Sequence, residues 1–160
     1  MSDKKKLAII ATKGTLDWAY PPFILASTAA ALDYEVQIFF TFYGLQLLKK
    51  NPPLKVSALG NPGMPMPMAM DKWFPNALQM IPGMESMMTG MMKSKMKKKG
   101  VASIETLRDA CIESEVKMIA CQMTVDLFDM KPTDLIDGIE FGGAALFFEF
   151  AGSSDINLFM

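Results

Sequence analysis

Short apolar runs alternate with helix-forming segments along this chain of 160 residues. The run Leu7–Thr12 is rich in β-forming residues, as expected for a strand buried on both faces of a sheet. A helical stretch follows, with Thr15 or Asp17 as its N-cap and Ala26–Leu32 as its strongest part, and Glu35–Phe42 is apolar again. A strand, a helix and a strand within about 40 residues predict a right-handed βαβ unit and therefore an α/β fold.

The alternation returns after residue 100. Ser103 is placed to cap a helix whose buried face carries Ile104, Leu107 and Cys111 at helical spacing. We then expect a strand over Val116–Cys121 and a short helix opened by Pro132. A short strand over Ile139–Phe141, a buried helix over Gly143–Ala151 and a final strand over Ile156–Met160 should follow. The pattern predicts a doubly wound α/β domain with a mostly parallel sheet of four to five strands.

The middle of the chain departs from this pattern. Prolines are too frequent in Gly60–Pro67 for a helix or an inner strand, so a loop is expected there. Eleven of the sixteen methionines lie between Met64 and Met96, and five of the seven residues of Lys93–Lys99 are lysine. We therefore expect one domain over residues 1–160, with a Met/Pro/Lys-rich insertion at about 60–100.

Within this insertion, Met84, Met87, Met88 and Met91 recur at helical spacing. They predict an amphipathic helix with a methionine face and a lysine tail. Such a helix could dock a protein partner, promote self-association, or lie at a membrane surface through Met84–Lys99. A lid or an ordinary core helix would show the same pattern. Copper binding by thioethers is disfavoured because no histidine assists.

Composition narrows the possible classes of protein. The chain is 51% hydrophobic and carries a formal net charge of −1, which is too apolar for intrinsic disorder and lacks the basic excess typical of nucleic-acid binding. No apolar run reaches the ~18 residues of a membrane span, and Pro21 and Pro22 interrupt the candidate Trp18–Leu32. The N-terminal apolar run is too short for a secretory signal. A reducing, cytoplasmic location is therefore expected.

The absence of histidine excludes several kinds of chemistry. Ser-His-Asp and Cys-His catalysis and HExxH zinc sites are impossible within this chain. Its two cysteines, Cys111 and Cys121, cannot alone supply a four-thiolate metal site. Neither a GxGxxG nor a GxxxxGK[ST] motif occurs, so no nucleotide cofactor and no metal are predicted.

Cys121 is the strongest candidate for chemistry because of its position. It ends a predicted inner strand, and ligands of open α/β sheets bind at the carboxyl edge of the strands. The residues after it, 122–128, look helical, so free amides and the helix dipole would favour an exposed, ionised thiolate. The alternative is a buried structural cysteine.

Other polar residues are weaker candidates. Lys13, Thr15 and Asp17 follow the first predicted strand and should lie at the same sheet edge, where loop solvation or helix capping would equally explain them. Cys111 lies on the apolar face of its predicted helix, which favours a packing role. Asp126 suits a surface or capping role.

Two segments resemble the DsrE/DsrF-like sulfurtransferase family, in its larger, DsrE-related branch with a Met-rich insertion. They are Val116–Leu127, with its strand-ending Ala120-Cys121-Gln122-Met123, and Asp137–Gly143. The N-terminal run Ala11–Asp17 is also similar to that branch. The resemblance implies a flavodoxin-like three-layer sandwich that forms homo-oligomers and carries sulfur as a persulfide on one cysteine, which matches Cys121.

The function expected from the resemblance is a cytoplasmic sulfur carrier, a sulfurtransferase in a relay between donor and acceptor proteins. Its thiolate would be Cys121, and Lys13, Thr15, Gln122 and Met123 would contact the sulfur-bearing substrate. A second hypothesis is a non-catalytic adaptor that docks a partner or a membrane through Met84–Lys99. A thiol peroxidase is a weaker third, because the single arginine, Arg108, lies in the preceding helix.

Overall fold

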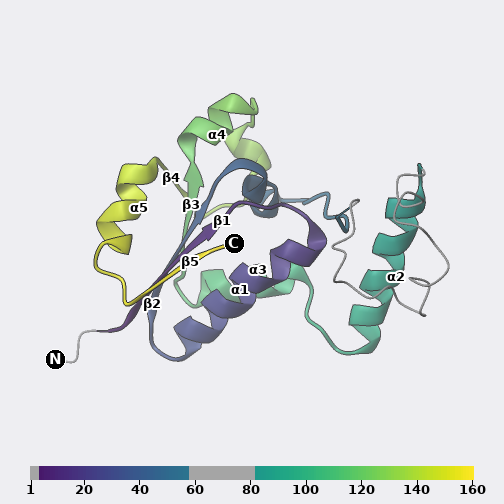
Figure 1. The fold of residues 1–160 in the computed structure, drawn as a ribbon, viewed down its shortest axis with the longest axis horizontal. Coiled ribbons are helices and arrows are strands. Elements are labelled where there is room, and N and C mark those ends of the chain that lie inside the picture. Colours follow the sequence, from purple (N-terminus) through teal and green to yellow (C-terminus); the bar gives the residue numbers. More distant parts are fainter. Residues whose placement is uncertain (1–3, 58–81) are drawn as a thin grey trace. The chain divides into compact units, whose positions relative to one another are not determined.

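A computed structural model describes residues 4–57 and 82–160 (Figure 1). In this part of the chain, five strands form one parallel sheet in the order β4-β3-β2-β1-β5. The strands are β1 (Lys6–Ala11), β2 (Glu35–Phe40), β3 (Lys117–Cys121), β4 (Glu140–Gly142) and β5 (Ile156–Phe159). The predicted α/β class and parallel sheet are confirmed, with β3 an inner strand as expected.

The chain divides into two compact units. The described residues of the first unit are 4–14, 18–54 and 103–160, and they include the whole sheet. The described residues of the second unit are 15–17, 55–57 and 82–102, and they include the helix α2 (Met84–Lys98). The expected Gly60–Pro67 loop lies outside the described residues, as do the methionines from Met64 to Met80.

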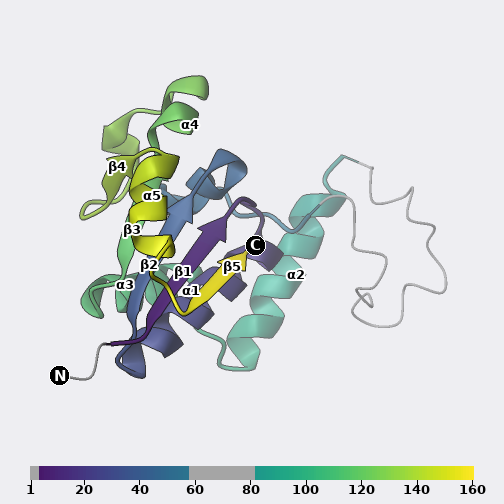
Figure 2. The same cartoon turned by 60° about the vertical axis from the view of Figure 1, so that its left-hand side comes forward.

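Helices cover the two faces of the sheet (Figure 2). The helices α1 (Leu16–Ala31) and α3 (Ile104–Glu113) lie on one face, where the rings of Phe23 and Phe40 are 5.9 Å apart. The helix α5 (Ala144–Ala151) lies on the other, where Phe39 and Phe147 are 5.4 Å apart. Alternate residues of β2 therefore serve two separate cores, because strand side chains point to opposite faces in turn.

Arg108 ties α3 to the segment that follows β2. That segment is a 3₁₀ helix, η1 (Phe42–Leu48). The buried guanidinium donates from Nη1 to the carbonyl oxygens of Leu47 at 3.0 Å and Lys49 at 2.8 Å, where η1 ends. The single arginine therefore holds the end of η1 against α3. The other end of η1 lies next to the candidate site.

Local expectations were met in part. Ser103 caps α3 by accepting a hydrogen bond from the Thr106 amide at 3.1 Å, and Ile104 and Cys111 are buried, as predicted. The helix α1 continues through Pro21 and Pro22, the pair that interrupts the apolar run Trp18–Leu32. Burial outweighs the two missing amide donors, since Pro22 is fully buried.

Three further expectations need correction. The second strand ends at Phe40, not Phe42, because the chain turns at Phe42 into η1. Asp17 does not cap α1: its carboxylate accepts hydrogen bonds from the amide and the hydroxyl of Ser57. The helix α5 is not buried as a whole, because it packs on the sheet through Phe147 and Ala151 and leaves Phe148 66% exposed.

The predicted helix at Met84 is confirmed as α2. Its buried residue is Thr89, whose hydroxyl donates to the carbonyl of Glu85 at 2.7 Å and accepts from the amide of Val56 at 3.0 Å. Met87 and Met91 are exposed. In the described residues no helix is long and apolar enough to cross a bilayer.

Candidate functional site

Cys121 lies where β3 ends and a short helix begins. It is the last residue of β3 and the N-cap of α4 (Gln122–Leu127), with extended backbone angles of −64° and 111°. Figure 1 shows α4 beyond the end of β3, at the carboxyl edge of the sheet. The predicted junction of strand and helix at Cys121 is therefore present.

Two threonine hydroxyls meet beside the sulfur. Thr41 follows β2 and Thr124 lies in α4, and their Oγ1 atoms are 3.2 Å apart. The Phe42 amide donates to Thr124 Oγ1 at 3.3 Å, which leaves the Thr124 hydroxyl proton available to another acceptor. Because β2 and β3 are paired neighbours, the residues that follow them come together at one edge of the sheet.

These groups alter the ionisation of the thiol. Burial raises the pKa of Cys121, but the Thr124 hydroxyl and amide, the Thr41 hydroxyl and the Met123 amide together lower it by more, so the net pKa lies below its ordinary value. The sulfur makes no cap hydrogen bond of ordinary geometry, so the amides act on it as nearby dipoles. The result is a thiol that ionises more readily than a free cysteine, as a sulfur nucleophile requires.

The expected exposure of this thiol was wrong. Cys121 is only 5% exposed and belongs to an apolar cluster on the α5 face of the sheet, with Phe39 and Phe147 among its members. It points to this face because it alternates with Ala120 along β3. Its sulfur therefore lies between hydrocarbon on one side and hydroxyl and amide groups on the other.

Close backbone contacts fix the loops around this edge. A Cβ on Gly44 would lie 2.1 Å from the carbonyl oxygen of Ala11, and a Cβ on Gly14 would lie 2.2 Å from that of Tyr43. The Thr41 amide donates to the Ala11 carbonyl at 3.1 Å. Only glycine permits this approach of η1 to the end of β1, which in turn sets the position of Thr41.

The other predicted site residues are distributed as follows. Gln122 and Met123 begin α4 beside Cys121, where Met123 contributes its amide while the Gln122 side chain donates to Asp126 Oδ1 at 2.7 Å. The Lys13 ammonium lies over the Trp18 ring, 3.2 Å from its centroid. The Thr15 hydroxyl lies 3.2 Å from that of Ser57, in the second unit.

Cys111 has the packing role that its helix face predicts. It is fully buried, and its sulfur donates to the Phe23 carbonyl at 3.5 Å. Burial raises its pKa to about 11. Both cysteines are free thiols, and their environments shift the two pKa values in opposite directions.

Thr41 and Thr124 were not among the site residues predicted from the sequence. Thr124 had a local signal, since it occupies the third position of the helix that Cys121 caps, where a side chain can turn back toward the cap residue. Thr41 had none, because its place beside Cys121 depends on β2 pairing with β3. Among the residues that the structure describes, no cluster of acidic and cysteine side chains could hold a metal ion.

Comparison with known proteins places the chain among its relatives. The model of the DsrE/DsrF/DrsH-like family matches residues 3–159. The chain belongs to this family. The sulfur carrier protein DsrE2 of Allochromatium vinosum is 75% identical over 158 residues, 99% of each chain, and the uncharacterized protein YrkE of Bacillus subtilis is 34% identical over 159 residues, 98% of this chain and 97% of that one.

The ychN protein from E. coli, a solved structure, covers 98% of this chain and 99% of its own, with a TM-score of 0.56 at 13% identity. At that identity the likeness concerns the fold alone, a flavodoxin-like α/β sandwich. The family and the fold implied by the resemblance are thus confirmed.

Proposed function

We propose that the protein is a sulfur carrier that holds sulfane sulfur as a persulfide on Cys121. The observation that carries this proposal is a thiol at the carboxyl edge of the sheet whose pKa is lowered by the neighbouring Thr41 and Thr124. The relative that is 75% identical is a sulfur carrier protein, which supports the same role.

The transfer is an exchange at sulfur that needs no histidine. The Cys121 thiolate attacks the outer sulfur of a donor persulfide, forming a bond from Sγ to that sulfur while the donor S–S bond breaks and the donor leaves as a thiolate. An acceptor thiolate then attacks the outer sulfur of the Cys121 persulfide, and Cys121 leaves as a thiolate. Neither step has a net oxidation or reduction, so no cofactor is needed.

The buried position of Cys121 requires that its cover open during exchange. The cover is weakly held: β4 has three residues, none of them buried, and α5 packs through Phe147 and Ala151. Elements with few buried contacts open at a small fraction of the global unfolding free energy. Between openings, the cover shields the persulfide from water and stray thiols.

Mass spectrometry after treatment with inorganic polysulfide tests the proposal. The expected result is an adduct of about 32 Da, one sulfur atom, which disappears in Cys121→Ser and on addition of dithiothreitol. Cys111→Ser is the matched control and should load as the parent chain does. An adduct that persists in Cys121→Ser, or that requires Cys111, would overturn the assignment.

The carrier's partners follow from this chemistry. They are a donor protein with a persulfide and an acceptor protein with a thiol, in the cytoplasm, where thiols stay reduced. We also propose a homo-oligomer, supported by the exposed Phe148 on α5 and the exposed Phe159 on the edge strand β5. Sedimentation velocity of Phe148→Ser and Phe159→Ser tests it, and an unchanged sedimentation coefficient would exclude these positions from the interface.

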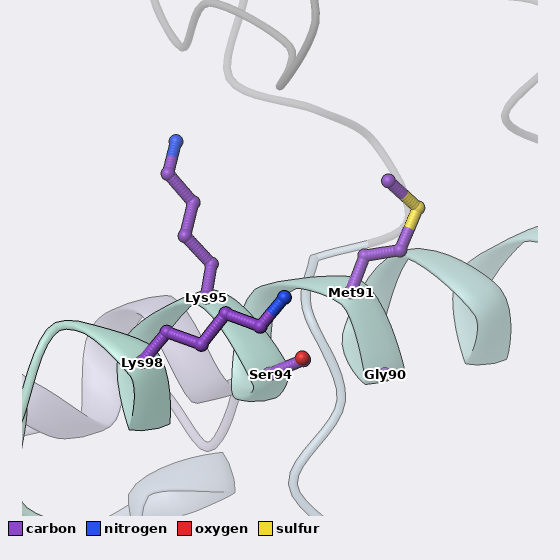
Figure 3. Close-up of a pocket in the computed structure, with 5 residues that line it drawn as sticks. All are labelled: Gly90, Met91, Ser94, Lys95 and Lys98. Atoms are coloured by element: carbon purple, nitrogen blue, oxygen red, sulfur yellow. The ribbon is translucent and has the colours of Figure 1, made fainter.

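The surface of α2 favours a second candidate function, contact with a partner or a membrane through Met84–Lys99. Gly90, Met91, Ser94, Lys95 and Lys98 line an open hollow on this helix (Figure 3). Exposed thioethers beside ammonium groups suit an anionic lipid surface. Co-sedimentation with phosphatidylserine vesicles should fall in Met87→Gln/Met91→Gln, and equal sedimentation of the parent and this variant would contradict it.

A further inference from the structure

An exposed apolar surface lies next to Cys121. It consists of Phe42 and Tyr43 of η1 with Met123, Leu127 and Phe128 of α4 and its C-cap, and we refer to it as the η1–α4 surface. Its two parts are in contact, because the rings of Tyr43 and Phe128 stack with centroids 5.8 Å apart. Tyr43 is 65% exposed and Met123 63%. Large apolar side chains gathered in this way are typical of an interaction site.

Backbone strain holds one of these side chains outward. Phe42 has a φ of 48°, in the left-handed region that a bulky side chain rarely adopts, and its ring is 47% exposed. An exposed phenylalanine gains little from packing, and glycine would occupy this backbone at no cost. The same residue donates its amide to Thr124 beside the sulfur, so the strained position joins the surface to the site.

The charge around the η1–α4 surface is negative. Asp126 lies on α4, and Asp129 directly follows Phe128, with both side chains exposed. The whole segment 122–142 holds one basic residue, Lys131, against five carboxylates, namely Asp126, Asp129, Asp134, Asp137 and Glu140, of which Asp137 lies 3.9 Å from the Lys50 ammonium. A basic partner would be attracted to this edge, and an acidic partner or an anionic membrane would be repelled.

We propose that the η1–α4 surface, with Asp126 and Asp129, binds the protein that exchanges sulfur with Cys121, through a segment of that protein in which a cysteine is flanked by apolar and basic residues. This inference rests on the proposed function and adds the class of partner to it. Contact with η1 and α4 brings the partner's thiol to the N-terminus of α4, from which it reaches Cys121 when the cover opens.

The experiment measures transfer from the persulfidated full-length chain to synthetic peptides. One peptide has a central cysteine flanked by alternating lysine and leucine, and its counterpart has glutamate in place of lysine. We expect the basic peptide to accept sulfur about tenfold faster at low salt, with the ratio approaching one near 1 M salt, where the Debye length is about 3 Å. Equal rates for the two peptides at low salt would overturn the proposal.

Two matched pairs of substitutions locate the contact. Asp126→Asn/Asp129→Asn should remove most of the preference for the basic peptide, while Glu113→Gln/Glu115→Gln makes the same change in charge before β3, at the opposite sheet edge, and should leave it unchanged. An equal loss in both variants would reduce the effect to net charge and overturn the proposal.

The apolar contact has its own test. Phe42→Gly removes an apolar side chain of the proposed docking surface, so transfer to the basic peptide should slow. Because glycine adopts this backbone conformation without strain, the melting temperature should not fall. Unchanged transfer in this variant would exclude Phe42 from docking, and a shift in its sedimentation coefficient would instead assign the surface to a second copy of the chain. Persulfide loading from inorganic polysulfide, measured in every variant, separates failure of docking from failure of the sulfur-carrier function itself.

Discussion

The hydroxyl oxygens of Thr41 and Thr124 lie 3.2 Å apart although 83 residues separate them in the chain. Thr41 follows β2, and Thr124 lies in the helix that follows β3, so the parallel pairing of these strands brings the two side chains together. Both hydroxyls help to lower the pKa of Cys121, and the backbone amide of Thr124 lowers it as well. The candidate site is thus a property of two neighbouring strand ends.

Replacement of Thr124 by valine should raise the pKa of Cys121, because it removes the hydroxyl beside the sulfur that favours the thiolate. Each unit of upward shift lowers the thiolate fraction at neutral pH about tenfold. The pH dependence of iodoacetamide alkylation, followed by mass spectrometry, measures this change. Thr89→Val is the matched control, a buried threonine of the second unit, and a similar change in that variant would contradict the assignment.

Replacement of Phe147 by alanine should speed alkylation of Cys121 by opening its cover. Loss of a buried aromatic side chain costs about 3 kcal/mol of unfolding free energy or more, so denaturant unfolding should shift as well. Leu32→Ala removes an apolar side chain that is 68% exposed directly after α1 and should change both quantities little. If Phe147→Ala unfolds earlier but its native form alkylates at the parental rate, α5 is not the cover.

Gly44 should not tolerate alanine, because its Cβ would lie 2.1 Å from a backbone oxygen that cannot move aside. We expect a loss of about 3 kcal/mol in unfolding free energy, measured by denaturant titration. Gly90→Ala is the control. Gly90 lies in the middle of α2, and no atom lies within 4 Å of the added Cβ, so this substitution should stabilise the helix by about 1 kcal/mol. Equal stability of Gly44→Ala and the parent would show that η1 can shift away from β1.

Cys111 should make the stability of the fold depend on alkaline pH. Its pKa is about 11 in the folded state against an ordinary 9.0, so the neutral thiol contributes stability that is fully present below pH 9 and lost as the pH rises toward 11. The loss amounts to about 2 kcal/mol. Cys111→Ser keeps a donor for the Phe23 carbonyl but does not ionise in this range, so its unfolding free energy should fall by less. Parallel curves for the two chains between pH 9 and pH 11 would contradict the role of burial.

Local sequence patterns determined much of this protein. The predicted strands match the five in the described residues to within about two residues. The inner strands β1, β2 and β3 are apolar because both of their faces are covered, whereas the edge strands β4 and β5 are short and largely exposed. The Ser103 cap and the buried face of α3 followed from side-chain chemistry within one helix turn. The position of Cys121 between a strand and a helix, and the family to which the chain belongs, were also evident from the sequence.

Tertiary structure alone decided the environment of the sulfur. The sequence places Cys121 at a strand end but does not say which face it takes or what covers that face, and the expected open thiol is in fact packed near Phe147. Thr41 became a neighbour through the pairing of β2 with β3. Strand pairing and helix packing join residues that are distant in sequence, so the pKa of the thiol depends on contacts that no local pattern contains.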